Sequence, residues 1–197
     1  MKNREYRTMQ LRAADNAGDK MTVEGYAAVF DQRTMIWESD YSGWKYYEEI
    51  DPGAFNGADM SDVILRYNHS DSAMILARTK NGTLRLSVDD VGLKISADIA
   101  PTTGGKDIYQ LIKRGDINQM SFAFIVKADQ TTRDDKLKEE IRRITAFETI
   151  VDVSPVDFPA YDGTSISARS ADAYIKSLEE AEKRAYKRKQ LLLRTYL

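Results

Sequence analysis

The stretch NQMSFAFIV, residues 118–126, is a dense apolar run that predicts a buried β-strand. In an extended chain, successive side chains alternate between the two faces of the sheet. One face would carry Ser121, Ala123 and Ile125, and the other would carry Phe122, Phe124 and Val126. A small hydroxyl residue among aromatic residues is most often a satisfied strand serine, so this position alone does not establish a function.

Similar runs on both sides of this stretch predict a mostly antiparallel sheet. Compact or alternating apolar runs predict strands over residues 21–30, 63–69, 83–88, 93–99 and 141–156. The third and fourth of these runs are separated by a short turn and predict a hairpin. The other expectations are a long loop or irregular hairpin over 34–47, a turn leading into a short helix over 50–55, and an exposed charged loop over 130–140.

Two stretches have helical periodicity. Residues 107–115 predict a short amphipathic helix with basic residues in its last turn and Gly115 as its C-terminal stop. From about Ala171, a strongly charged segment repeats its apolar residues at helical spacing. The expected organisation is a domain over residues 1–170 and a charged C-terminal helix or tail over 171–197. The expected fold class is α+β, a mostly antiparallel β-barrel, closed or nearly closed, surrounded by a few helices.

The composition is typical of a soluble globular protein and narrows the chemistry. Of the 197 residues, 42% are hydrophobic and 30% charged, and the net charge of −2 indicates no bias towards nucleic acid or anionic membranes. No stretch has the length of a membrane span or the pattern of a signal peptide, so we expect a cytosolic protein. The chain has no Cys and a single His, His69. Thiol proteases, Cys-ligated zinc and zinc sites with several imidazoles are therefore excluded, and His69 is the only imidazole base.

Three residue types of a serine-protease triad lie on or next to apolar strands. His69 ends the apolar run over 63–69 beside polar residues, a position suited to a cleft. Ser121 supplies a hydroxyl, and acids follow near residue 150. The chain order His–Ser–acid is no obstacle, because such triads are defined by geometry and not by order.

The acidic member has two candidates on the last strand. Simple alternation predicts that Glu148, Ile150 and Asp152 share one face. An acid within an apolar strand is costly to bury unless it is paired, so Asp152 needs a partner. An imidazole N–H would serve, and so would an arginine such as Arg142 or Arg143.

Five segments carry a family resemblance. They are VEGYAAVF (residues 23–30), EEIDPGAF (48–55), LRYNH (65–69), GDINQMSFAF (115–124) and DVSPVDFPAY (152–161). In this order they resemble the prohead protease family of tailed phages, the HK97-type maturation proteases related to the herpesvirus assemblins. The resemblance implies that His69 is the general base, Ser121 the nucleophile and Asp152 the third member. The herpesvirus relatives use a second His there, which this chain lacks, so Glu148 stays open as the alternative.

The resemblance also implies the biology. It implies a serine endopeptidase with an assemblin-like fold that works inside the procapsid, in the host cell cytoplasm, and that needs no cofactor or metal. Its partners would be the major capsid protein with its scaffolding region, or a separate scaffold protein, and such enzymes often cleave themselves. The herpesvirus relatives are active as dimers, so a homodimer is one implied state. No specific nucleic acid and no membrane is expected as a partner.

Two other functions compete with the protease. The first is a non-enzymatic capsid-assembly or scaffold module on the same fold, in which His69 and Ser121 are structural. The second is a metal-dependent hydrolase that uses Asp89, Asp90 and Asp98, although adjacent Asp residues in a hairpin turn are more typical of solvated turn formers. For the protease, the backbone amides of Ser154–Val156 are a candidate oxyanion hole.

Overall fold

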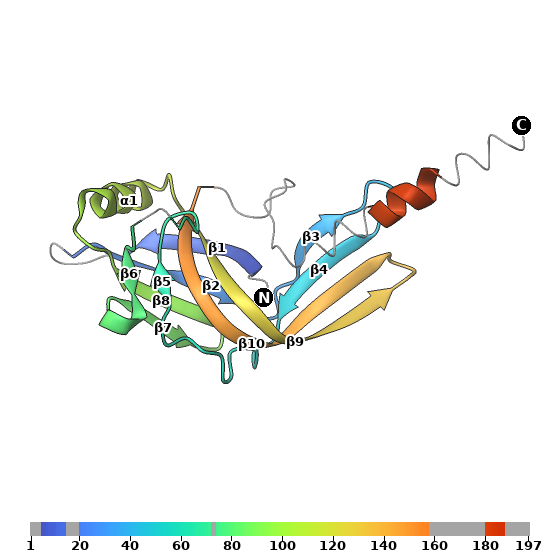
Figure 1. Ribbon diagram of the computed structural model, residues 1–197, viewed down its shortest axis with the longest axis horizontal. Helices are drawn as coiled ribbons and strands as arrows, with labels where there is room; N and C mark the ends of the chain where they lie inside the picture. The colour runs from blue at the N-terminus through green and yellow to red at the C-terminus, as the bar shows by residue number, and fades with distance from the viewer. Residues whose placement is uncertain (1–4, 15–19, 72–73, 158–179, 188–197) are drawn as a thin grey trace, which may run out of the picture.

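The computed structural model describes residues 5–14, 20–71, 74–157 and 180–187 (Figure 1). Strands of these residues form one mixed sheet in the order β3-β4-β10-β9-β1-β2-β8-β7, and β5 pairs with both β10 and β6. Among these strands, β10 runs parallel to β4 and β5, and the other pairs are antiparallel. The strands are β1 (Glu5–Ala13), β2 (Thr22–Val29), β3 (Thr34–Glu38), β4 (Lys45–Ile50), β5 (Ile64–Leu65), β6 (Ala77–Arg78), β7 (Leu84–Val88), β8 (Gly92–Asp98), β9 (Gln119–Asp134) and β10 (Glu139–Val156).

The strand-rich α+β class is confirmed, but a closed barrel is not shown. The order of the described strands has two ends, at β3 and β7. Ala100, just after β8, donates a backbone hydrogen bond of 2.9 Å to the carbonyl of Leu76, just before β6. This bond does not join β6 to β8 as paired strands, and the sheet of the described residues is open.

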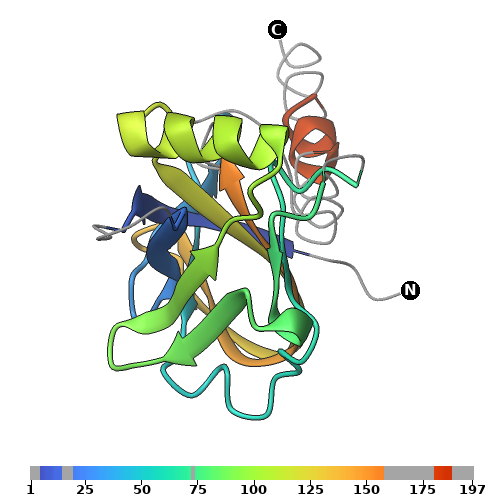
Figure 2. The same ribbon diagram turned by 90° about the vertical axis from the view of Figure 1, so that its left-hand side faces the viewer.

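The helix that was expected over 107–115 is present and longer. It is α1 (Thr103–Arg114), and it begins where the Thr102 side chain accepts a 3.1 Å hydrogen bond from the Gly105 amide. It ends at Gly115, which has a φ of 90° and so takes the left-handed conformation that favours glycine. Figure 2 shows α1 lying across one end of the sheet.

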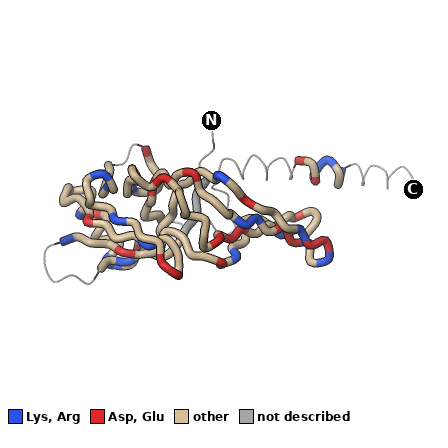
Figure 3. Tube along the Cα trace, turned by 90° about the horizontal axis from the view of Figure 1, so that it is seen from below, with Lys and Arg blue, Asp and Glu red and all other residues tan. Residues whose placement is uncertain are grey.

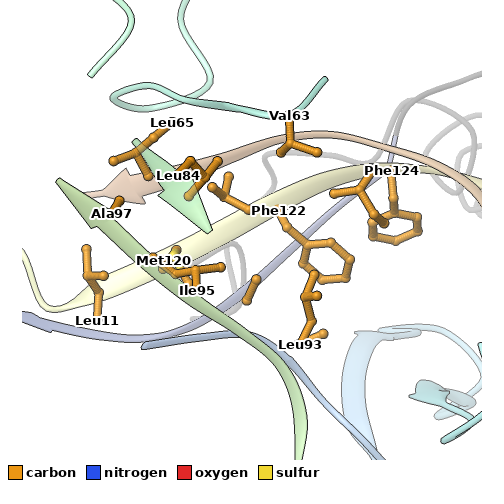
Figure 4. Close-up of a cluster of buried hydrophobic side chains, with 14 of the residues drawn as sticks. Leu11, Val63, Leu65, Leu84, Leu93, Ile95, Ala97, Met120, Phe122 and Phe124 are labelled. Atoms are coloured by element: carbon orange, nitrogen blue, oxygen red, sulfur yellow. The ribbon is translucent and has the colours of Figure 1, made fainter. Parts of the chain in front are cut away.

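One face of β9 and β10 builds the hydrophobic core (Figure 4). Phe122 and Phe124 stack with ring centroids 4.7 Å apart, and Phe147 of β10 packs 4.9 Å from Phe124. All three rings are fully buried, and Leu65 and Val63 pack against the same cluster. The predicted partition of residues 121–126 is therefore confirmed for the phenylalanines, which leaves Ser121 on the opposite face of the sheet.

Replacing Phe147 is expected to reveal how much this core stabilises the fold. Phe147→Ala removes a ring that contacts Phe55, Phe122 and Phe124, and it should lower the free energy of unfolding by about 3–5 kcal/mol. Leu137→Ala is the matched control, because Leu137 is 66% exposed, and it should change that energy by less than about 0.5 kcal/mol. Denaturant titration followed by circular dichroism measures both, and equal midpoints for the two variants would contradict this account of the core.

The expected loop over residues 130–140 is wrong, because β9 and β10 continue as strands almost to their connecting turn. β9 is 16 residues long and β10 is 18. Their outer halves pair with each other, the outer half of β10 also pairs with β4, and β4 pairs with β3. These strands form an arm, defined here as β3, β4 and residues 127–146. Figure 3 shows mixed charges along this arm. Contacts of the charged side chains stabilise the arm. Arg142 pairs with Asp129 of the neighbouring strand, and the Arg133 guanidinium lies 3.8 Å from the centre of the Trp44 ring. A charged stretch therefore forms strands because its neighbours compensate its polarity.

Three further segments, over residues 34–47, 50–55 and 63–69, match the sequence-based expectations to different extents. Residues 34–47 form the irregular hairpin of β3 and β4, with a register shift between Met35 and Trp37. The turn expected after Ile50 is present, and the Asp51 carboxylate accepts a hydrogen bond from the Gly53 amide there. The short helix expected after this turn is absent, and consecutive turns take its place. The strand expected over 63–69 is reduced to the two residues of β5, although Arg66 and Asn68 still donate backbone hydrogen bonds to β10 before the chain turns at His69.

The C-terminal segment is described only over residues 180–187, which are helical as expected. The Glu182 carboxylate accepts hydrogen bonds from Ser39 and Ser42 in the β3–β4 turn, and the Tyr186 ring lies 5.7 Å from that of Tyr41. The expected boundary near residue 170 and the turn expected over 158–163 lie outside the described residues. Within the described part of the chain, no helix is both long and apolar enough to cross a membrane.

Candidate active site

A tight turn after β5 places His69 over β10. The Arg66 amide donates to the Val153 carbonyl at 3.1 Å, and the Asn68 amide donates to the Pro155 carbonyl at 3.0 Å. The chain then turns sharply, because Asn68 and His69 both have a φ of 52°. Asn takes this left-handed conformation more readily than most residues, but two such residues in succession are uncommon. Backbone strain of this kind clusters at functional sites.

The His69 side chain meets a buried carboxylate. Its Nδ1 lies 2.5 Å from Oδ1 of Asp152, which is only 1% exposed. Ser154 Oγ donates to the same Asp152 oxygen at 3.1 Å and accepts a hydrogen bond from the His69 amide at 3.2 Å. Asp152 and Ser154 therefore hold both the ring and the backbone of His69. A buried carboxylate needs such partners.

The arginines considered as partners of Asp152 bind other acids. Arg143 pairs with Asp31, Glu49 and Asp51. Arg142 pairs with Glu48 and Asp129. These contacts involve β4 and the arm, so the imidazole is the partner that the structure gives Asp152. The hydrogen bonds from Gly53 and Arg143 lower the pKa of Asp51 below its usual value.

The expectation that Glu148, Ile150 and Asp152 share one face is wrong. Ile150 is opposite Phe124 and Asp152 is opposite Ala123, so neighbouring residues of β9 face them and their side chains point to opposite faces. The cause is an irregularity between Ile150 and Asp152, where β10 has one extra residue. Ile150 consequently joins the core, and Asp152 points to the face that carries His69.

Glu148 lies four residues before Asp152 on β10, at a second register shift between Phe147 and Thr149. Its carbonyl accepts a hydrogen bond from the Asp59 amide at 2.9 Å, which ties this part of β10 to the segment before β5. Asp152 contacts the His69 ring, and Ser154 accepts a hydrogen bond from the His69 amide. Of the two acids considered, Asp152 is the one in direct contact with the imidazole.

Ser121 lies beside this cluster. In the pairing of β9 with β10 it is directly opposite Ser154, so the two side chains project from the same face. Cross-strand neighbours of this kind have Cβ atoms about 4.5–5.5 Å apart. Ser121 is 3% exposed and is flanked by the buried side chains of Met120 and Phe122 on the other face. The sheet register thus brings the Ser121 hydroxyl next to the residue that bonds both His69 and Asp152.

Sequence reasoning missed the role of Ser154. Its spacing of two residues from Asp152 was the available signal, because residues i and i+2 of a strand share a face. The oxyanion hole expected at Ser154–Val156 does not fit, since Pro155 has no N–H and both other residues pair with β9, opposite Ser121 and Gln119. The carbonyls of Val153 and Pro155 accept hydrogen bonds from Arg66 and Asn68, on the β5 side of β10. Because backbone groups alternate between the two sides of a strand, the amides of Ser154 and Val156 point to the other side, towards β9.

The acids of the β7–β8 hairpin have structural partners. Asp89 accepts from the Tyr26 hydroxyl at 2.8 Å and from the amides of Val91 and Gly92, and these bonds keep the pKa of Asp89 below its usual value. Asp98 pairs with Arg85 at 3.0 Å. Across the described ranges, no group of three or more His, Cys, Asp or Glu side chains is placed to hold a metal ion.

A comparison with known protein families matches most of the chain. A sequence model of the caudovirus prohead serine protease family matches residues 7–178. The chain belongs to this family. The matched region contains the His69 turn, Ser121 and the end of β10, and the family's members are serine proteases of phage capsid maturation. Searches of curated proteins and of solved structures return no significant match.

Proposed function

We propose that this prohead protease is a serine endopeptidase that cleaves the scaffold protein, or the scaffolding region of the major capsid protein, during procapsid maturation. His69 is the general base, Ser121 the nucleophile and Asp152 the acid that orients the imidazole. The observation that carries the proposal is the His69–Asp152 contact of 2.5 Å beside Ser154, which faces Ser121 across the sheet. Membership of the family supports the reaction class.

The chemistry is acyl transfer. Nδ1–H of His69 donates to Asp152, which leaves Nε2 as the basic nitrogen of the neutral ring. Nε2 takes the Ser121 proton as Oγ attacks the substrate carbonyl carbon, and the imidazolium then protonates the leaving amine as the C–N bond breaks. In the second half, His69 takes a proton from water as the water oxygen attacks the acyl carbon, and the imidazolium then returns a proton to Ser121 Oγ as its bond to the acyl group breaks. Asp152 stabilises the imidazolium in both halves.

The biological setting follows from the same proposal. The enzyme acts inside the procapsid, in the host cell cytoplasm, on neighbouring capsid or scaffold chains. We include in this proposal that the enzyme cleaves itself in the region after β10 and that it is active as a homodimer. We also propose that its fold is related to the β-barrel of the assemblins. None of these steps requires a cofactor.

Labelling with a serine-directed fluorophosphonate tests the proposal against a non-enzymatic capsid module on the same fold. The activated Ser121 should form the only stable adduct, located by mass spectrometry of the digested protein. Ser121→Ala should remain unlabelled, whereas Ser87→Ala, which alters an exposed serine of β7, should label like the parent protein. An unlabelled parent protein that is folded and assembles with capsid proteins would favour the non-enzymatic module.

A further inference from the structure

We propose that Asp157 and Asn68 are positioning residues that hold His69 in its productive orientation. Together with Tyr67 they form what we call the Asp157 latch, a set of side-chain contacts between the His69 turn and the end of β10. The proposal rests on the proposed protease function for its consequence in catalysis, but the contacts themselves do not depend on it.

The latch is reciprocal. Asn68 Nδ2 donates to Asp157 Oδ2 at 2.8 Å, and the Asp157 amide donates back to Asn68 Oδ1 at 3.2 Å. The Tyr67 hydroxyl donates to the other oxygen of the same carboxylate. Three consecutive residues, Tyr67, Asn68 and His69, are thus tied to β10 or to the residue that follows it.

The turn needs such support because its conformation is strained. Asn68 and His69 both have positive φ values, which non-glycine residues adopt only where the surroundings enforce it. Backbone contacts contribute, since Ser70 donates to the Tyr67 carbonyl at 3.1 Å and Asn68 to the Pro155 carbonyl. The two side-chain bonds of Asn68 with Asp157 add a constraint that other side chains at position 68 would not make.

The position of Asp157 explains how the constraint reaches the imidazole. Asp152, Ser154 and Asp157 lie on one short stretch of chain, and they contact the ring of His69, its amide and the turn before it, respectively. If the turn relaxed towards negative φ, the ring would leave Asp152 while β10 stayed in place. Catalytic rates are sensitive to such shifts, since a misplacement of 1 Å costs about 10²-fold.

Tyr67 is suited to remain a donor in this arrangement. Burial and the hydrogen bond to Asp157 raise the pKa of Tyr67 to about 12, so the phenol keeps its proton under working conditions. Asp157 is exposed, and no buried contact of the core depends on its side chain. Its substitution should therefore disturb the turn without unfolding the domain, which makes the latch testable.

The test exchanges the two partners. Asn68→Asp places two carboxylates opposite each other, so neither side chain can donate to the other and their negative charges repel, while Asp still tolerates the left-handed conformation. The double variant Asn68→Asp with Asp157→Asn restores an amide donor opposite a carboxylate. We expect Asn68→Asp to lower kcat for cleavage of the capsid precursor about 10²-fold with little change in KM, and the double variant to recover most of that loss.

Two further variants serve as controls. Asn68→Gly keeps the freedom to adopt a positive φ but loses the side-chain amide, so it should resemble Asn68→Asp if the latch, and not strain alone, matters. Asp135→Asn removes one carboxylate at the tip of the arm, where Asp135 is 82% exposed, and should keep the parent rates. Circular dichroism confirms that each variant is folded.

A second readout separates the latch from the protease proposal. His69 is the only His of the chain, so in a protein without a histidine tag its imidazole NMR signals are assigned without further work. The Nδ1–H signal should be present in the parent, weaken in Asn68→Asp and return in the double variant. That pattern without any cleavage activity would support the latch and refute the protease. Unchanged signals and rates in Asn68→Asp, or no recovery in the double variant, would refute the latch.

Discussion

Ser121→Ala is expected to give a folded protein that no longer cleaves the capsid precursor. The substitution removes the atom that forms the acyl intermediate, and loss of a serine nucleophile lowers kcat about 10⁶-fold. Folding should survive, because Ser121 lies on the face opposite the phenylalanine core and its neighbour on that face, Ala123, is already an alanine in full burial. Electrophoresis of the incubated precursor, with mass spectrometry of its fragments, measures the loss.

The control for this experiment is Ser87→Ala, which removes the hydroxyl of an exposed serine and should process the precursor at the parent rate. A thermal unfolding curve of Ser121→Ala checks that the fold is intact. If a folded Ser121→Ala protein produced the same fragments at the same rate, Ser121 would not be the nucleophile, and the proposed function would have to be abandoned.

Asp152→Asn is expected to lower kcat about 10⁴-fold. The amide that replaces the carboxylate can present an N–H to Nδ1 and so stabilise the ring tautomer that has its proton on Nε2, which cannot accept the Ser121 proton. The imidazolium also loses the negative charge that lies 2.5 Å from its Nδ1 in the parent protein. Cleavage rates of the parent and the variant, measured on the same precursor, give the ratio directly.

Glu148→Gln is the matched comparison, because it makes the same change from acid to amide four residues earlier on β10. One strand irregularity separates Glu148 from Asp152, Glu148 itself lies at a second, and its carbonyl accepts a hydrogen bond from the Asp59 amide. We expect its rate to stay close to that of the parent. The opposite ranking, with Glu148→Gln losing most of the rate, would assign the orienting role to Glu148 and leave Asp152 as a structural partner of His69.

Much of the fold could be predicted because alternation is a local property. The hairpin of β7 and β8, the end of α1 at Gly115 and the partition of Phe122 and Phe124 from Ser121 all follow from periods of two or 3.6 residues. These patterns need no knowledge of which strand is the neighbour, so they can be read from one sequence.

Other features depend on neighbours and could not be predicted. Residues 130–140 are mostly polar and were expected to form a loop, yet residues 130–134 and 139–140 lie in strands. Contacts across the arm stabilise these strands, such as the pair of Arg142 with Asp129 and the contact of Arg133 with the Trp44 ring. The irregularities of β10 leave no periodic signal, and one of them reverses the face of Asp152 relative to Ile150. Strict alternation therefore placed Ile150 on the same face as Asp152, whereas the two side chains point to opposite faces.

The sequence alone determined the components of the candidate site. It has one imidazole, it places Ser121 on the face of its strand away from the aromatic side chains, and its five family segments name the reaction class. Only the tertiary structure decided how these components meet. His69 and Asp152 are 83 residues apart, and their contact depends on the parallel pairing of β5 with β10, on a strained turn held by Asp157 and on a strand irregularity. Each of these is set by long-range hydrogen bonds and packing, which local periodicity does not encode.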